Sequence, residues 1–184
     1  MQVFTDINSQ DVTKLLCSGA IGVIRTDTLY GLVCRAADQV AVESIYAIKG
    51  RDDTKSPIVL VSNINQLFDQ PSAEERVVIE SVWPGPVSVI IHSTQAPEWI
   101  RRQNDSVAYR MPANDALCAL LEKTGPLIAP SANPQSQPPA LSIEEAMNYF
   151  GSFVDFYVEG GIVESSLPSK LLRIDSKGNI ERLR

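Results

Sequence analysis

Short apolar runs alternate along this chain with segments that have the caps and spacing of amphipathic helices. Residues 20–24 form one such run, and residues 58–61 and 87–92 are β-branched runs of the same kind. Between the first two, Asp38 precedes a segment whose apolar residues recur at helical spacing. Strands that alternate with helices are typical of α/β domains. The pattern predicts a single α/β domain over residues 1–184, built on a twisted mixed β-sheet flanked by helices.

The remaining elements follow from the same signals. A short polar residue at the N-cap and a glycine or proline at the end mark each helix, and β-branched or aromatic runs mark the strands. We expect helices that begin after Ser9, Asp38, Asn63, Ser72, Asn114 and Ser142, with Val77, Val78 and Val82 facing inward in the fourth of these, and strands at 20–24, 58–61, 87–92, 107–110, 127–129, 153–158 and 171–174.

Charge and cysteine content exclude several classes of protein. The formal net charge of −6 argues against a broad nucleic-acid footprint, because such binding depends on neutralising phosphates. The three cysteines are far apart and form no C-x-x-C pair, and His92 is the one histidine, so no metal site is predicted. No apolar run is long enough to cross a bilayer, and the N-terminus lacks a signal-peptide pattern. We expect a cytoplasmic protein.

The most informative polar stretch is Thr-Asp-Thr-Leu-Tyr-Gly-Leu at residues 26–32, directly after the first buried run. A helix-length gap later, Lys49, Arg51 and Lys55 place three cations in one short segment. Hydroxyls at the end of a strand, close to clustered Lys and Arg, suit an anionic ligand. Either piece alone is more simply a polar turn or a solvated loop. The two together favour a site.

Further polar residues follow other predicted strands. Ser131 and Asn133 come directly after the 127–129 run, and Arg110 ends the run that Ser106 precedes. Each of these has an ordinary structural explanation, as a turn or an ion pair. The chain has no G-x-x-x-x-G-K-[ST] and no G-x-G-x-x-G sequence, so any nucleotide is bound without a P-loop or a Rossmann phosphate cradle.

In order and spacing, this set of motifs resembles the YrdC-like threonylcarbamoyl-AMP synthase family, in its short bacterial form. The resemblance runs from about residue 20 to the C-terminus. Each motif alone is weak, but six in order are strong. They are residues 26–32, Lys49-x-Arg51, the Trp83-Pro84-Gly85-Pro86 turn, Val107-Ala108-Tyr109-Arg110, Ser131-x-Asn133 and Pro168-Ser169.

The resemblance implies a YrdC-like fold and a nucleotidyltransferase that combines L-threonine, bicarbonate and ATP into threonylcarbamoyl-AMP and pyrophosphate. The product serves threonylcarbamoyladenosine modification of tRNA, together with partner proteins of that process. ATP is a substrate, and a phosphate-bridged magnesium ion is expected. By matching position, Thr28, Arg110, Ser131 and Ser169 would hold threonine; Arg51, Lys55, Ser106, Asn133 and a C-terminal arginine, Arg184 or Arg182, would contact ATP; and Lys49 and Arg51 would form the catalytic basic pair.

The residue types agree with this chemistry. The carboxylate of threonine suits an arginine fork such as Arg110, and its hydroxyl suits short polar partners such as Thr28 or Ser131. A carbamate that attacks the α-phosphorus needs positioning and charge stabilisation more than a protein nucleophile. The absence of a nucleophile–base–orienter set in the sequence is therefore compatible with this reaction.

Four residues, at three places in the chain, depart from the family pattern. Arg25 stands where a proline is common, Ser56 follows Lys55 where a proline is usual, and Gln135-Ser136 replaces Ser-Gly beside Asn133. These departures keep two alternatives open: a catalytically silent binder of threonine or nucleotide, and an RNA-binding or ribosome-associated module. The net charge weighs against the second, so weak or no direct RNA binding and no membrane association are expected.

Overall fold

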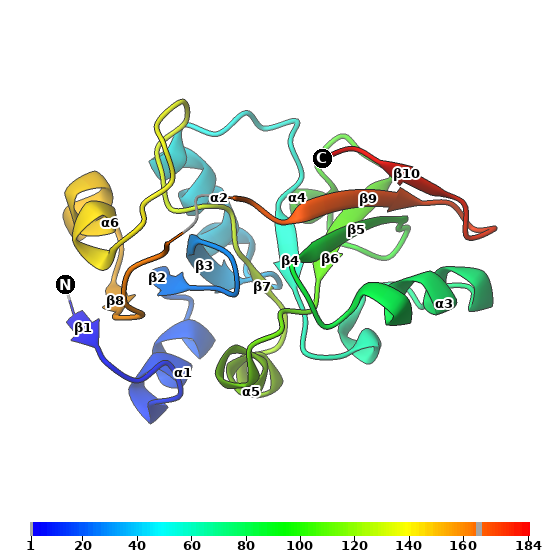
Figure 1. Ribbon diagram of the computed structural model, residues 1–184. Coiled ribbons are helices and arrows are strands. Elements are labelled where there is room, and N and C mark those ends of the chain that lie inside the picture. Colours follow the sequence, from blue (N-terminus) through cyan, green and yellow to red (C-terminus); the bar gives the residue numbers. More distant parts are fainter. Residues whose placement is uncertain (1, 165–166) are drawn as a thin grey trace.

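The described residues, 2–164 and 167–184, form ten strands in one mixed sheet with helices on both faces (Figure 1). In this computed structural model the strand order is β1-β8-β2-β3-β7-β4-β6-β5-β9-β10, and parallel and antiparallel pairs alternate irregularly along it. The predicted α/β fold with a mixed sheet is confirmed. The elements are β1 (Gln2–Phe4), α1 (Gln10–Cys17), β2 (Gly22–Arg25), β3 (Tyr30–Arg35), α2 (Gln39–Lys49), β4 (Ile58–Leu60), η1 (Ile64–Gln66), α3 (Ala73–Val82), β5 (Val87–His92), α4 (Glu98–Arg101), β6 (Ser106–Arg110), α5 (Asp115–Thr124), β7 (Leu127–Ile128), α6 (Ile143–Phe150), η2 (Gly151–Phe153), β8 (Phe156–Val158), β9 (Lys170–Ile174) and β10 (Ile180–Arg182).

Alternation of side chains along the strands decides which helices cover which face. Val23 and Val59 point into a core with apolar residues of α2, α3, α4 and α6. Their neighbours Ile24 and Leu60 point the other way, into a core with α1 and α5. Figure 1 shows α1 and α5 next to each other on that face. Because both faces are covered, these central strands read as continuous apolar runs in the sequence.

Caps fix the ends of α2, which leads into the basic segment. The Asp38 carboxylate accepts a hydrogen bond from the Ala41 backbone N–H at 3.0 Å, which begins the helix where the sequence predicts. The helix ends at Gly50, whose φ of 60° lies in the left-handed region that favours glycine. This ending turns the chain sharply after Lys49. Lys49 is therefore the last residue of the helix, and Arg51 and Lys55 follow it in the loop after the turn.

The structure corrects several of the predicted elements. The segment after Asn63 is a single 3₁₀ turn rather than an α-helix. Val77 is 70% exposed, and Ile79 is the residue of α3 that is fully buried. Strands β1, β3 and β10 and helix α4 are not among the predicted elements. Three of these four are four residues or shorter, which is too short for a periodic pattern, and β1 and β10 are the edge strands of the sheet.

The unpredicted strand β3 matters most, because it changes how the polar stretch is placed. Strands β2 and β3 form an antiparallel hairpin, so the hydroxyl-rich residues 26–29 are its turn. The chain after β7 then runs beside β3, where the Leu32 N–H donates to Pro130 O at 2.9 Å. A Cβ at Gly31 would lie 3.3 Å from that carbonyl oxygen, which explains the glycine. The hairpin turn and the segment after β7 thus meet at the middle of the sheet.

Among the residues that the structure describes, no helix is both long and apolar enough to cross a membrane.

Candidate active site

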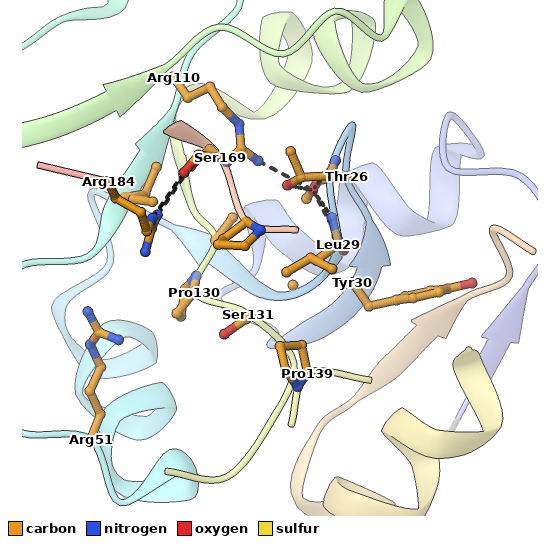
Figure 2. Close-up of a pocket in the computed structure, with 15 residues that line it drawn as sticks. Thr26, Leu29, Tyr30, Arg51, Arg110, Pro130, Ser131, Pro139, Ser169 and Arg184 are labelled. Atoms are coloured by element: carbon orange, nitrogen blue, oxygen red, sulfur yellow. Dashed lines mark hydrogen bonds between the residues drawn. The ribbon is translucent and has the colours of Figure 1, made fainter. Parts of the chain in front are cut away.

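A cavity of about 330 Å³ lies at this meeting point (Figure 2). Its wall comes from the hairpin turn after β2, the end of β6, the segments after β7 and before β9, and the last residue of the chain. These segments are far apart in the sequence and come together only through the sheet order. Six residues predicted from the sequence line the cavity: Thr28, Arg51, Arg110, Ser131, Ser169 and Arg184.

Thr26 builds the hairpin turn that presents Thr28. The Thr26 hydroxyl donates to Leu29 O at 2.7 Å and accepts from the backbone N–H groups of Thr28 and Leu29, each at 3.2 Å. Because these bonds occupy the buried Thr26 hydroxyl, its role is to close the turn. The half-buried Thr28 also lines the cavity, and its hydroxyl lies 3.2 Å from that of Thr26, within hydrogen-bond distance.

Arg110 ends β6 as a buried guanidinium, 3% exposed, that is held on one side (Figure 2). Its Nη2 lies 3.0 Å from the Asp27 carboxylate and donates to the Thr26 hydroxyl at 3.3 Å. Burial lowers the pKa of Arg110, which Asp27 opposes, and burial raises the pKa of Asp27, which Arg110 opposes. Asp27, which the sequence analysis leaves without a role, is therefore the partner that orients this arginine.

Ser169 is held from behind by a residue that the sequence analysis passes over. Its hydroxyl lies 2.9 Å from that of Ser88 in β5, and both side chains are buried. From the open side, Arg184 Nε donates to Ser169 O at 3.0 Å (Figure 2). Strand β10 pairs with β9, and the Leu171 N–H donates to Arg184 O at 3.1 Å, which brings the C-terminal arginine to the cavity. Of the two C-terminal candidates, Arg184 lines the cavity and Arg182 is exposed on β10.

Lys49 lies behind the segment after β7 rather than in front of it. Its ammonium donates to Ser131 O and Asn133 O, both at 2.5 Å, and lies 3.3 Å from the Asn133 side-chain oxygen. Only 5% of the residue is exposed. Burial, together with the nearby charge of Arg51, lowers the pKa of Lys49 to about 7. In this position, Lys49 fixes the backbone of the Ser131–Asn133 turn.

Residues 51–56, here called the cation loop, border a second cavity of about 300 Å³ beside the first. Arg51 and Ser131 line both cavities, so the two adjoin. The Tyr46 hydroxyl donates to Lys55 O at 2.6 Å, and the Arg51 guanidinium lies 5.5 Å from the centre of the Tyr46 ring. Tyr46 of α2, which the sequence analysis does not single out, is thus a support of this loop.

The second cavity also contains the two unusual residues Gln135 and Ser136. Ser136 adopts a φ of 70°, a left-handed conformation with a steric cost for any residue that has a Cβ. The conformation explains why glycine is the residue that the family pattern has there. Arg25, another departure, donates to Gly160 O at 2.5 Å and so supports the segment after β8.

Ser106 does not join these groups. It begins β6, pairs with His92 of β5, and is not among the described residues that line either cavity. Arg110 lies at the other end of the same strand. The structure thus gathers every predicted site residue except Ser106 around two adjoining cavities: Thr28, Lys49, Arg51, Lys55, Arg110, Ser131, Asn133, Ser169 and Arg184.

Comparison with known proteins gives concordant results. Residues 14–184 match the family model Sua5_yciO_yrdC, described as telomere recombination. A threonylcarbamoyl-AMP synthase of Pseudomonas fluorescens is 33% identical over 177 residues, an alignment that covers 94% of this chain and 95% of that protein.

Solved structures share the fold over the whole chain. The crystal structure of P. abyssi Sua5 complexed with L-threonine superposes with a TM-score of 0.89 at 25% identity, and covers 100% of this chain. The chain spans 57% of the length of that Sua5 protein. E. coli YciO superposes with a TM-score of 0.85 at 21% identity, covering 100% of this chain and 93% of its own, which shows the common fold.

Proposed function

Because this chain belongs to the Sua5/YciO/YrdC family, we propose that it is a threonylcarbamoyl-AMP synthase. In this reaction the amino group of L-threonine takes up bicarbonate and forms an N-carboxylate, with loss of water. An oxygen of that carboxylate attacks the α-phosphorus of ATP. The new P–O bond forms as the bond to the bridging oxygen breaks, and pyrophosphate leaves with the bond's electron pair. The product is threonylcarbamoyl-AMP.

The observation that carries this proposal is the junction of two cavities of different chemistry. One is lined by three arginines, of which Arg110 is buried, together with short hydroxyls, and the other by two lysines and Arg51 together with short polar side chains and Gln135. The first suits an amino acid with a side-chain hydroxyl, and the second suits a triphosphate. They meet at Arg51 and Ser131, so a carbamate in the first would face a phosphate in the second.

In the first cavity we assign threonine to Thr28, Arg110, Ser131 and Ser169. Arg110 is charged, oriented by Asp27, and aimed at the cavity, which suits the threonine carboxylate. Thr28 supplies a hydroxyl from the hairpin turn after β2, and Ser131 supplies one from the segment after β7. Ser169, fixed by Ser88, completes the set.

We assign the ATP phosphates to Arg51, Lys55 and Asn133, with Arg184 at the rim between them and threonine. Arg51 borders both cavities, so its guanidinium can stabilise charge that develops at the α-phosphate. Lys49 has a different role: it positions Ser131 and Asn133 through their backbone carbonyls. Ser106, outside both cavities, has no role in this assignment.

A magnesium ion, if the reaction uses one, belongs to the nucleotide. Among the described residues no group of three or more His, Cys, Asp or Glu side chains is placed to hold a metal. Magnesium is commonly bound through substrate phosphates and water rather than in a protein cage. The cation loop would then contact the phosphates that the ion does not neutralise.

The product supplies tRNA modification, which places the reaction in the cytoplasm and makes proteins of that process its partners. Direct RNA binding is not favoured. The net charge of −6 and the enzymatic names of the relatives both weigh against an RNA-binding module.

The test is to mix the protein with ATP, L-threonine and bicarbonate, and to measure pyrophosphate release. We expect release that requires all three. Release without threonine would contradict the assignment. Binding of threonine and ATP with no release would instead identify a silent binder, and a salt-dependent affinity for RNA above that for ATP would identify an RNA-binding module.

A further inference from the structure

Gln135 links the two sides of the second cavity. Its side-chain oxygen accepts a hydrogen bond from the backbone N–H of Asp52 at 3.0 Å, across from the segment after β7 to the cation loop. Its own backbone N–H donates to Lys49 O at 2.8 Å, which fixes the base of the side chain. The side chain therefore lies across a cavity whose other lining includes Arg51 and Lys55.

The position of this oxygen is chemically specific. A backbone N–H that points into a group of cations is a donor that an anion would otherwise use. The Gln135 oxygen occupies that donor as a neutral acceptor. The Asp52 carboxylate does not, because it accepts from Thr54 Oγ1 at 2.7 Å and from the Thr54 N–H at 2.9 Å. A phosphate oxygen bound to Arg51 and Lys55, the cations on either side of Asp52 in the sequence, could use the same donor.

We propose that Gln135 sets the nucleotide affinity of this enzyme by competing with a phosphate oxygen for the Asp52 N–H. The proposal rests on the function proposed above and concerns only its nucleotide subsite. Phosphate binding requires the amide side chain to leave this donor and turn toward solvent. Gln135 is exposed, so the movement needs no change in the core. The cavity that holds threonine lacks Gln135, so threonine affinity is independent of it.

The main test is Gln135→Ala, with the dissociation constants of ATP and of inorganic pyrophosphate measured by calorimetry. Loss of one competing hydrogen bond should tighten ATP binding by about fivefold, and pyrophosphate binding in the same direction. The dissociation constant of L-threonine should not change. Gln137→Ala is the matched control, because Gln137 lies two residues further on and engages Asn133 through its backbone carbonyl.

A second variant tests the sign of the effect. Gln135→Glu keeps the acceptor and adds a negative charge beside Arg51 and Lys55, so ATP should bind more weakly than to the wild type. Weaker or unchanged ATP binding by Gln135→Ala would overturn the proposal, and weaker binding would show that Gln135 helps to hold the loop in its binding form. The proposal would also be overturned if neither the wild type nor Gln135→Ala bound ATP or pyrophosphate measurably.

Ser136 needs its own variant, because it shares the loop. Ser136→Gly relieves the cost of the positive φ without touching the Gln135 side chain, so it should stabilise the fold and leave the ATP affinity unchanged. A gain in ATP affinity from Ser136→Gly equal to that from Gln135→Ala would assign the effect to the backbone and overturn the proposal. Absence of pyrophosphate release by the wild type, with ATP still bound more tightly by Gln135→Ala, would contradict the proposed function alone.

Discussion

The two halves of the site are built in opposite ways. The threonine half consists of buried side chains held by other buried side chains: Arg110 is 3% exposed and pairs with Asp27, and Ser169 is 2% exposed and pairs with Ser88. The nucleotide half consists of an exposed loop, where the Lys55 side chain is 63% exposed and its ion pair with Asp52 spans 3.7 Å. Arg110 of the threonine half ends strand β6 of the sheet, whereas the cation loop of the nucleotide half follows helix α2.

The difference implies that the threonine half is rigid before the ligand binds, whereas the cation loop can rearrange when the ligand binds. A buried, paired arginine cannot move without breaking its ion pair, so the threonine half is organised before the ligand arrives. Exposed ion pairs contribute little, so the cation loop can exchange its internal hydrogen bonds for phosphate contacts at small cost. We therefore expect substitutions in the threonine half to affect both folding and binding, and substitutions in the cation loop to affect catalysis alone.

The largest effect should come from Arg110→Ala. Removal of the guanidinium leaves the Asp27 carboxylate buried without its partner, which should lower the free energy of unfolding by about 3–5 kcal/mol and abolish threonine binding. Urea denaturation and calorimetry would measure the two effects. The double variant Arg110→Met with Asp27→Asn should regain much of the stability but no threonine binding. If Arg110→Ala were as stable as the wild type, the buried ion pair would not hold the threonine half together, and the contrast with the cation loop would be wrong.

Next in size is Arg51→Ala, which should leave folding intact and abolish synthesis. Its hydrogen bonds, to Lys55 O at 3.4 Å and to Ser56 O at 3.1 Å, lie within the cation loop, so their loss should leave the midpoint of thermal unfolding almost unchanged. Pyrophosphate release should fall by about 10²–10³-fold, as when one group that stabilises transition-state charge is removed. Arg76→Ala, an exposed arginine on α3, is the control. Normal release by Arg51→Ala would remove the cation loop from the mechanism.

A smaller effect should distinguish L-threonine from L-valine. The two have nearly the same shape, but valine lacks the hydroxyl that would form hydrogen bonds with Thr28 and Ser131. Binding of valine should be about tenfold to a hundredfold weaker by calorimetry, from the loss of these hydrogen bonds. Equal affinities would mean that these two residues do not recognise the ligand hydroxyl.

The last prediction concerns the dependence of stability on pH. The pKa of Lys49 is lowered from 10.5 to about 7 in the folded protein, so between these pH values the unfolded chain binds more protons. Stability contributed by this group is therefore lowest below pH 7 and rises with pH, by at most about 1.4 kcal/mol per unit. The wild type should gain stability relative to Lys49→Met in urea unfolding from pH 7 to 10. Lys123→Met, at an exposed position on α5, should show no such trend.

Local patterns were enough to predict most of the elements. The caps at Asp38 and Asn114 and the glycine at position 50 act on neighbouring residues, so they are readable without a structure. Strand β3 was missed because Tyr30 to Leu32 belong to a motif with hydroxyls and a glycine, which read as a ligand loop rather than a strand. Val77 was misplaced because three valines on α3 do not by themselves say which face is buried.

The candidate site divides in the same manner. Thr28, Arg51, Arg110 and Ser131 were named from the sequence because they match the family's motifs in order and spacing, although each alone has an ordinary structural explanation. Asp27, Ser88 and Tyr46 were not, because their role is to hold another side chain, and each is separated in sequence from the residue that it holds. Ser106 was named by position in a motif, yet it lies at the far end of β6 from Arg110.

The sequence by itself determined the α/β class, the family and the types of group that meet the ligands, because caps, apolar runs and motifs are properties of neighbouring residues. Only the tertiary structure decided which residues face one another. The order of strands in the sheet brings Arg110 to Asp27, and the bond from the Gln135 N–H to Lys49 O holds Gln135 beside the Asp52 N–H. Contacts of this kind depend on chain closure over 80 residues or more, and no local pattern encodes them.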